Sequence, residues 1–289
     1  MTKKALITGI TGQDGAYLSE FLVKKGYKVF GAVRRTSSIN TSRLSYMGIL
    51  NDVEIVPMDL AEITNIQRLV EKIEPDEIYN LAAQSFVQTS YEQPIYTSDI
   101  DGIGVTRLLE TIRNLGGKPK FYQASTSEMF GKAQESPQNE KTPFYPRSPY
   151  GIAKLYSHWM TINYREAWDM FACSGILFNH ESPLRGTEFV TRKISQGMAQ
   201  IALKKIEKIN LGNLNAERDW GFAGDYVEAM WLMMQAEKPD DFVIATQTQF
   251  SIRDFLKLAF KEVNISNWEQ YVKINKDFKR PVDVNSLCG

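Results

Sequence analysis

The chain has 289 residues, and its 34 basic and 34 acidic side chains cancel to a formal net charge of zero. A mean hydropathy of -0.31 and a hydrophobic content of 43% indicate a soluble globular protein of two domains, or one large domain with an appended lobe. The balanced charge argues against a nucleic-acid-binding protein, and no apolar run is long enough to predict a membrane span.

The small number of cysteines and histidines argues against a disulfide-rich protein and against a Cys/His metal site. Cys173 and Cys288 are too few for a disulfide framework, and His158 and His180 are the only histidines, so no Cys/His spacing for a metal exists. The apolar run near the N-terminus is short and broken by glycine, which favours a buried strand over a signal peptide. We therefore expect a cytoplasmic protein without a metal.

Short β-branched runs alternate with amphipathic stretches through the first part of the chain. The runs predict strands at 4–8, 28–33, 53–58, 77–81 and 120–124, and apolar residues at helical spacing predict helices at 17–25, 63–73 and 101–115. This alternation is typical of βαβ units. The sequence therefore predicts an α/β fold of the Rossmann type, with a doubly wound parallel sheet covered by helices on both faces.

Beyond residue 180 the pattern is less regular. It predicts helices at 191–208 and 226–236, a strand at 242–245, and a capping box at Ser251–Asp254 before a further helix. We interpret 1–178 as a dinucleotide-binding domain to which 211–247 returns in part. Residues 179–289 would mainly form a smaller α/β substrate-binding lobe.

A glycine-rich turn follows the first predicted strand. Glycines at a spacing of three permit a tight turn and a close approach of the backbone to a phosphate, and the helix N-terminus that follows favours a pyrophosphate. A purely structural turn needs fewer glycines. We expect a dinucleotide at this turn, whose candidate binding residues are Gly9, Thr11, Gly12, Gln13, Asp14 and Gly15.

The end of the second strand bears on the choice of nucleotide. An NAD site usually places an acidic residue there, whereas this chain has Arg34 and Arg35, which suit the 2′-phosphate of NADP. The alternative is a solvated basic loop. Further candidate cofactor contacts follow the third and fourth strands, at Asp59, Leu60, Leu81, Ala82, Ala83 and Ser85.

A phenol and an ammonium lie one helical turn apart at Tyr150 and Lys154. The Lys ammonium and a bound nicotinamide cation would lower the pKa of the phenol, so that Tyr150 could act as a base. Chance produces this spacing often. The preceding strand, however, ends in Thr126 and Glu128, which at strand spacing can face one side of a cleft at the carboxyl edge of the sheet.

Together these motifs resemble the extended short-chain dehydrogenase/reductases, and among them the GDP-mannose 4,6-dehydratase family. The closer resemblance rests on runs that span nearly the whole chain: 11–15, 80–85, 125–129, 177–183 and 218–221. It implies a dehydration without net redox change, in which NADP takes a hydride from C4 of a GDP-sugar and returns it to C6. Tyr150 would remove the C4 hydroxyl proton, Glu128 would act at C5 and C6, Thr126 would hold the sugar, and Lys154 would hold the nicotinamide ribose.

The resemblance also implies binding roles and an assembly. His180 and Arg185 would contact the cofactor, while Ser85, Asn179, Lys193, Arg218 and Arg280 would contact the substrate. For His180 a structural imidazole is the alternative, and for Lys193 and Arg218 it is surface ion pairing. The loop from Arg35 to Arg43 is similar to a segment that reaches a neighbouring subunit's cofactor, so a homo-oligomer, a dimer or tetramer, is implied.

The sequence departs from the family pattern at several positions near the expected pocket. Phe86, Leu184, Phe222 and Gly224 replace more polar or basic residues, which leaves GDP-manno-heptose open as the substrate. The chain also ends sooner than the family usually does, so we expect either a truncation or the lack of a terminal helix. A sugar-nucleotide epimerase or reductase would not need Glu128, and a non-catalytic NADP sensor would not need the four catalytic residues together.

Overall fold

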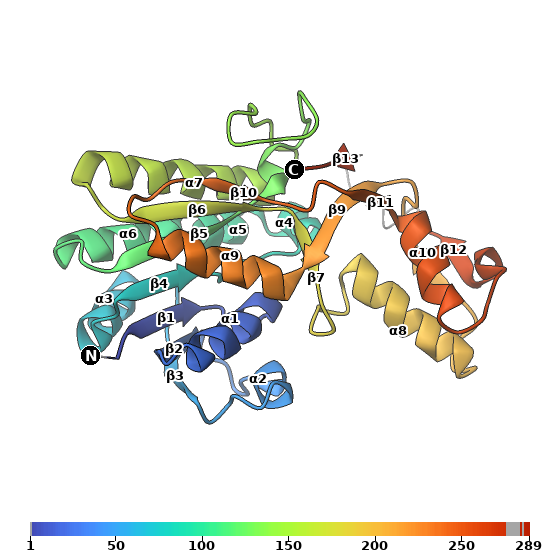
Figure 1. The fold of residues 1–289 in the computed structure, drawn as a ribbon, viewed down its shortest axis with the longest axis horizontal. Helices are drawn as coiled ribbons and strands as arrows, with labels where there is room; N and C mark the ends of the chain where they lie inside the picture. Colours follow the sequence, from blue (N-terminus) through green and yellow to red (C-terminus); the bar gives the residue numbers. More distant parts are fainter. Residues whose placement is uncertain (1, 276–283, 285) are drawn as a thin grey trace.

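The computed structural model describes residues 2–275, 284 and 286–289. Its larger body is built on a seven-stranded sheet in which every neighbouring pair of strands is parallel (Figure 1). The strand order is β10-β6-β5-β4-β1-β2-β3. The strands are β1 (Lys4–Thr8), β2 (Lys28–Val33), β3 (Val53–Pro57), β4 (Glu77–Asn80), β5 (Lys120–Thr126), β6 (Ala172–Leu177) and β10 (Phe242–Ile244).

The strand order reverses between β1 and β4. The chain adds β2 and β3 on one side of β1, then returns to add β4, β5 and β6 on the other. Thr8 at the end of β1 lies beside Ala32 of β2 and Asn80 of β4. Open α/β sheets bind ligands in the crevice at such a switch point, outside the carboxyl ends of the strands. The predicted doubly wound fold is confirmed.

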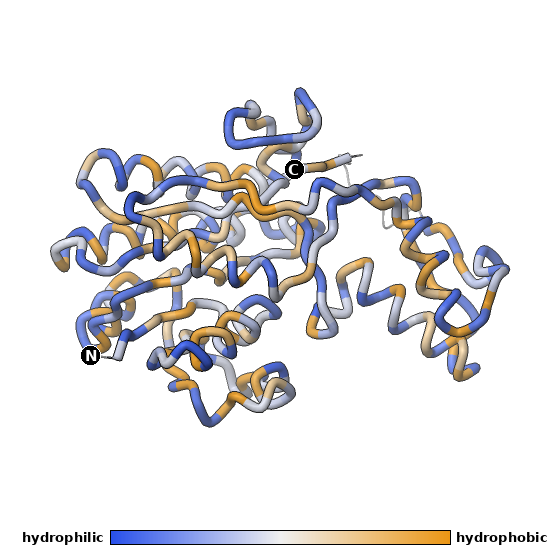
Figure 2. The backbone as a smooth tube through the Cα atoms, viewed as in Figure 1, coloured by the Kyte–Doolittle hydropathy of each residue, from blue (hydrophilic) through white to orange (hydrophobic). Residues whose placement is uncertain are grey.

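Two hydrophobic clusters cover the two faces of the sheet. Helices α1 (Gln13–Lys24) and α9 (Ala223–Gln235) close one face, and α3 (Ile63–Ile73), α6 (Gly104–Asn114) and α7 (Pro149–Trp168) close the other. Figure 2 shows hydrophobic residues concentrated in the strands between these layers. Because both faces are buried, the strands are almost continuously apolar rather than alternating.

Short elements complete the connections at the carboxyl edge of the sheet. They are α2 (Ser42–Tyr46), α4 (Val87–Glu92), α5 (Pro94–Ser98), the π-helix η1 (Asp99–Ile103) and the 3₁₀ turn η2 (Ser127–Met129). The helix predicted over 101–115 is therefore divided, because its first part is a π-helix. The helix predicted from Tyr17 already begins at Gln13, directly after the glycine turn.

The smaller lobe is built from α8 (Val190–Ala202), β8 (Ile209–Leu211), α10 (Ile252–Lys261), the 3₁₀ turn η3 (Trp268–Tyr271) and β12 (Val272–Ile274). It has its own core, which includes Ile194, Leu256 and Phe260. The capping box at Ser251 and Asp254 is confirmed. The helix predicted to reach Lys208 is wrong beyond Ala202, because the chain reverses through Lys204, at a φ of 56°, to form β8.

A four-stranded sheet lies between the body and the lobe, and it consists of β7 (Asn179–Glu181), β9 (Glu217–Phe222), β11 (Gln249–Ser251) and β13 (Ser286–Leu287). Within the described ranges, no helix has both the length and the apolar character needed to cross a bilayer. Those residues also include no group of three His, Cys, Asp or Glu side chains that could hold a metal ion.

Candidate active site

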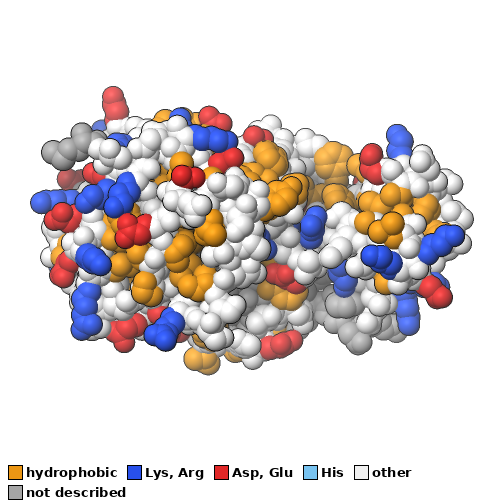
Figure 3. Space-filling model, turned by 90° about the horizontal axis from the view of Figure 1, so that it is seen from below, with side chains coloured by type: hydrophobic (Ala, Val, Ile, Leu, Met, Phe, Trp, Pro, Cys, Tyr) orange, Lys and Arg blue, Asp and Glu red, His pale blue; other side chains and the backbone are white. Residues whose placement is uncertain are grey.

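A cavity of about 520 Å³ opens at the switch point and extends toward the smaller lobe. Figure 3 shows the molecule from below, with Lys and Arg side chains in the depression between the body and the lobe. Most of the predicted site residues line this one cavity: Gly9, Gly12, Gln13, Asp14, Gly15, Leu81, Ala83, Ser85, Thr126, Glu128, Tyr150, Lys154, Asn179, His180, Arg185, Lys193 and Arg218.

The glycine turn leaves no room for side chains. Gly9 has a φ of 71°, and a Cβ there would lie 2.9 Å from the backbone of Ala82. A Cβ on Gly15 would lie 2.5 Å from the carbonyl oxygen of Gly9. Helix α1 follows Gly12 without a side-chain cap, and its first residues, Gln13, Asp14 and Gly15, line the cavity. This arrangement suits an anionic group such as a pyrophosphate.

Tyr150 and Lys154 both point from the first turns of α7 into the cavity. The helix begins there because the Ser148 hydroxyl accepts a hydrogen bond from the Gly151 amide, and Pro149 occupies the first helical position. The Lys154 ammonium donates to the carbonyl oxygen of Ala124 at 2.9 Å and lies 5.9 Å from the centre of the Tyr150 ring.

The expected lowering of the Tyr150 pKa is not a property of the protein alone. Burial raises the pKa of this phenol, and the negative charge of Asp101 raises it further, while a hydrogen bond with Thr126 opposes the rise. Burial also lowers the pKa of the Lys154 ammonium, against the charge of Asp101. The hydrogen bond with Thr126 does not outweigh these effects, so a pKa of Tyr150 below that of an ordinary phenol would need positive charge from a bound ligand as well.

Thr126 and Glu128 reach the cavity by a different route from the one predicted. Strand β5 ends at Thr126, and the chain then turns through η2, so the two side chains do not share a strand face. The Thr126 hydroxyl accepts a hydrogen bond from the Glu128 amide at 3.3 Å, which fixes this turn. Both side chains nevertheless line the cavity that Tyr150 enters.

Asp101 is a buried carboxylate that sequence reasoning missed. It belongs to the π-helix η1 and is fully buried; one oxygen accepts a hydrogen bond from the Gln84 amide at 2.7 Å, and the other has no partner. Burial raises its pKa to about 6, against the charge of Lys154. A signal was present, since Asp101 precedes Val105, Leu108 and Ile112 at helical spacing and so falls on an apolar face.

Several predicted cofactor residues lie outside the cavity lining. Thr11, Ala82, Arg34, Arg35, Asp59 and Leu60 do not belong to it. Arg34 is exposed and donates to the Tyr96 hydroxyl, while an oxygen of Asp59 accepts from the Ala61 amide at 3.0 Å. Leu60 is a core residue. Arg280 lies outside the residues that the structure describes.

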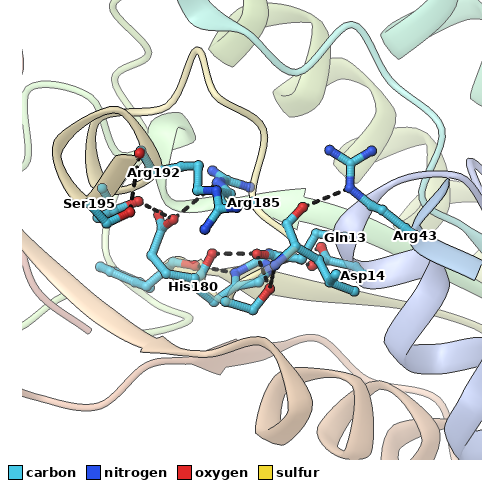
Figure 4. A network of polar contacts seen from close by, with 12 residues as sticks. Gln13, Asp14, Arg43, His180, Arg185, Arg192 and Ser195 are labelled. Carbon is cyan, nitrogen blue, oxygen red and sulfur yellow. Dashed lines mark hydrogen bonds and ion pairs between the residues drawn. The ribbon is translucent and has the colours of Figure 1, made fainter. Parts of the chain in front are cut away.

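Arg43 lines the cavity instead, although the sequence placed it only in a loop that reaches a neighbouring subunit. Its guanidinium donates to the carbonyl oxygens of Leu184 at 2.7 Å and Thr11 at 2.9 Å. The arginine thus holds the glycine turn against the segment that follows β7, within one chain. Figure 4 shows it approaching the turn from the side opposite Arg185.

His180 and Arg185 lie in one polar network at the wall of the cavity (Figure 4). His180 contacts Asp14 at 2.8 Å, and Arg185 pairs with Glu181 at 3.2 Å. The Arg185 guanidinium also stacks on the ring of Phe189, 3.6 Å from its centre. These pairs join the glycine turn to β7 and to the start of α8.

The lobe side of the cavity is lined by Asn179, Lys193 and Arg218, from β7, α8 and β9. Burial lowers the pKa of the Lys193 ammonium. Phe86 and Phe189 form an edge-to-face pair, with ring centres 5.8 Å apart, in the same wall. The arrangement places the cationic side chains of Lys193 and Arg218 on the lobe side of the cavity, and the Phe86–Phe189 pair joins a residue of the body to the start of α8 in the cavity lining.

Comparison of the sequence with known proteins identifies the family of this chain. A family model described as GDP-mannose 4,6 dehydratase matches residues 6–289. The GDP-mannose 4,6 dehydratase of Dictyostelium discoideum is 51% identical, with 99% of this chain and 88% of that protein covered. The GDP-mannose 4,6-dehydratase of Yersinia enterocolitica is 55% identical, with 91% and 73% covered.

Solved structures support the fold. The UDP-glucose 4-epimerase of Thermotoga maritima superposes with a TM-score of 0.86 at 22% identity, covering 99% of this chain and 89% of that one. The dTDP-glucose 4,6-dehydratase of Bacillus anthracis gives a TM-score of 0.82 at 18% identity, with 95% and 84% covered.

Proposed function

This chain belongs to the GDP-mannose 4,6-dehydratase family, and on that premise we propose that it is a hydro-lyase that converts GDP-mannose into GDP-4-keto-6-deoxy-mannose. The observation that carries the proposal is the meeting of Thr126, Glu128, Tyr150 and Lys154 in one cavity. A glycine turn suited to a pyrophosphate lies at one end of that cavity, and cationic side chains lie at the other.

The proposed cofactor is NADP. The glycine turn at Gly9 and Gly15, where any Cβ would collide with backbone, fits a dinucleotide pyrophosphate. Arg34 and Arg35 follow β2 where NAD enzymes usually carry an acidic residue, which favours a 2′-phosphate. When bound, the nicotinamide supplies the hydride acceptor for C4 and the donor for C6.

Tyr150 is assigned to the C4 hydroxyl, from which it takes the proton as the carbonyl forms. Its phenol is buried in the cavity wall, which raises its pKa, and a hydrogen bond with Thr126 partly offsets that rise. Lys154 supports the same step, because its ammonium is fixed by the Ala124 carbonyl and adds positive charge beside the ring. Thr126 would also hydrogen-bond the sugar near C4.

Glu128 is assigned to the elimination. A 4-ketone acidifies the C5 proton, which the carboxylate removes as the C5–C6 double bond forms. The same group then returns a proton to the departing C6 hydroxyl, which leaves as water. Glu128 is half-buried at the cavity wall, where it reaches a sugar held by Thr126 and Tyr150. One carboxyl group thereby serves first as base and then as acid.

The GDP moiety is assigned to the lobe end of the cavity. Lys193 and Arg218 would neutralise the diphosphate, and Asn179 would add a hydrogen bond. Ser85 also lines the cavity and would contact the sugar. Phe86 and Phe189 form an apolar wall whose position bears on whether mannose or a manno-heptose is preferred.

The test is to incubate the protein with NADP and either GDP-mannose or GDP-manno-heptose, and to identify the products by NMR. We expect a 4-keto-6-deoxy sugar from GDP-mannose, and a lower rate with NAD. Glu128→Gln should bind NADP normally and lower the rate by about 10²–10⁴-fold. An epimerised or reduced sugar, or full dehydratase activity in Glu128→Gln, would reject the assignment.

We also propose that the chain forms a homo-oligomer in the cytoplasm. Large apolar side chains are exposed on α5 and α7, at Ile95, Ile152, Tyr156 and Trp159. Exposed apolar side chains on two helices that pack against each other are typical of subunit contacts. Sedimentation velocity should show a dimer or tetramer, and a monomer at every concentration tested would refute it.

A further inference from the structure

Both ring nitrogens of His180 face acceptors. Nδ1 lies 2.8 Å from the carbonyl oxygen of Phe178, and Nε2 lies 2.8 Å from a carboxylate oxygen of Asp14. A carbonyl cannot donate, so Nδ1 carries a proton. The remaining proton lies between Nε2 and the carboxylate, and in either position the His180–Asp14 pair is neutral overall.

The electrostatics of the site favour an imidazolium paired with a carboxylate. Burial alone would raise the pKa of Asp14, but the charge and hydrogen bond of His180 lower it to about 2. Burial likewise opposes the charged form of His180, but Asp14 outweighs it and raises the pKa of the imidazole. The two residues are 166 positions apart in the sequence and meet only in the folded protein.

Asp14 lies in the first turn of α1, at the rim of the glycine turn. An unpaired carboxylate there would repel an anionic ligand at the helix N-terminus. A second contact reinforces the pairing, since the Gln13 amide nitrogen donates to Asp14 at 3.0 Å and to the His180 carbonyl at 3.2 Å. Ser182 donates to the Gln13 side-chain oxygen at 2.7 Å. Figure 4 shows Gln13, Asp14 and His180 facing one another across the network.

No other titratable group named here around the pair neutralises Asp14 in place of His180. Arg185 acts on both residues, but it is paired with Glu181 at 3.2 Å, so that pair is also close to neutral. Tyr226 of α9 stacks on the imidazole, with ring centres 4.4 Å apart, and Tyr122 of β5 faces Asp14; burial raises the pKa of both phenols. These tyrosines therefore add no charge near neutral pH.

We propose that His180 is a positioning residue that cancels the charge of Asp14 and fastens the glycine turn to β7, so that the N-terminus of α1 can accept the phosphates of the dinucleotide. This differs from the direct cofactor contact that the resemblance implied for His180. The inference rests on the proposed function only in taking a dinucleotide as the ligand.

Three variants separate charge from packing. His180→Gln leaves Asp14 without its cation, and we expect NADP to bind about 5–30-fold more weakly, the range for a charge at a helix N-terminus. Asp14→Asn removes the repelling charge, and its measured affinity is the reference against which the double variant is compared. The double variant Asp14→Asn/His180→Gln should have the same affinity as Asp14→Asn. If His180 acted only through packing, replacing it would weaken NADP binding equally whether residue 14 is Asp or Asn.

The pH dependence of NADP binding provides a second readout. In His180→Gln the half-buried carboxyl of Asp14 loses its imidazolium partner, so its pKa is higher than in the unchanged protein. The loss of affinity should therefore be larger at about pH 8 than at about pH 6, and the double variant should lack this difference. His158→Gln, which changes the other histidine at a site outside the cavity lining, is the matched control and should keep the affinity.

The charge state can be read without any cofactor. With only two histidines, NMR of isotope-labelled histidine in the otherwise unchanged protein resolves His180 from His158. We expect both nitrogens of His180 to keep imidazolium shifts to a higher pH than those of His158, and Asp14→Asn to lower the pH at which His180 loses them. If no dinucleotide binds to the unchanged protein, the proposed function fails while this experiment still tests the pair. A neutral His180 at pH 7, or equal losses in His180→Gln and the double variant, would overturn the inference.

Discussion

Asp101 allows a quantitative test of how burial changes the pKa of a carboxyl group beside the site, and with it the pH dependence of stability. Its carboxyl group is fully buried, one oxygen lacks a partner, and burial raises its pKa from 3.8 to about 6. A carboxyl whose pKa is raised on folding binds its proton more tightly in the folded state. Its contribution to stability is therefore greatest at low pH and is lost as the pH rises through about 6.

The magnitude follows from the pKa difference. A rise from 3.8 to about 6 corresponds to about 3 kcal/mol of unfolding free energy lost on ionisation, since one unit is worth about 1.4 kcal/mol. About 2 kcal/mol of this falls between about pH 4.5 and about pH 7.5. Asp101→Asn cannot ionise, so it lacks this pH-dependent loss. Any fixed cost of placing an amide at the site cancels when the two pH values are compared.

The assay is urea unfolding of the unchanged protein and of Asp101→Asn across this pH range. The stability of the variant relative to the unchanged protein should improve by about 2 kcal/mol toward the higher pH. Asp99→Asn, which removes a more exposed carboxylate from the same π-helix, is the matched control. Parallel pH profiles for Asp101→Asn and the unchanged protein would refute the raised pKa.

Three further predictions follow from the geometry. Gly9→Ala forces a side chain into left-handed backbone 2.9 Å from Ala82, so thermal unfolding should show a loss of roughly 2–4 kcal/mol, and calorimetry should show weaker NADP binding; an unchanged affinity would contradict the assigned cradle. Tyr150→Phe should lower kcat by about 10²–10⁴-fold in a product assay while retaining NADP, and a merely twofold loss would exclude Tyr150 as the base. Arg165→Met leaves the largely buried Asp241 carboxylate without its ion pair at 2.7 Å, and urea unfolding should show a loss of about 2–3 kcal/mol; an unchanged midpoint would mean that the pair contributes nothing.

The sequence predicts those parts of the site whose residues lie close together in the chain and form short motifs. The glycines after β1, the pair Tyr150 and Lys154, and the residues at the end of β5 each combine a short spacing with the end of a recognisable strand or the start of a helix. Parallel strands bring their carboxyl ends to one edge, so placing the strands also placed these residues. The predicted strand geometry of Glu128 was wrong, because the turn η2 begins at Ser127. Glu128 nevertheless lines the cavity.

The remaining parts depend on contacts between distant segments. Arg43 reaches Thr11 and Leu184 only because the connection after β2 folds back over the glycine turn. The contact between Asp14 and His180 likewise joins α1 to β7, and no spacing in the sequence encodes it. Asp101 was missed for another reason: the sequence shows that it falls on an apolar helical face, but helical periodicity does not reveal that a π-helix buries it there.

The most direct test of the proposed dehydration is to follow the hydrogen atoms. GDP-mannose deuterated at C4 is incubated with the protein and NADP in ordinary water, and the unlabelled sugar is incubated in deuterated water. NMR of the products should show the C4 deuterium at C6 in the first sample and solvent deuterium at C5 in the second. A 4-keto-6-deoxy product without the transferred label, an unexchanged C5, or no such product would contradict the roles given to Tyr150 and Glu128.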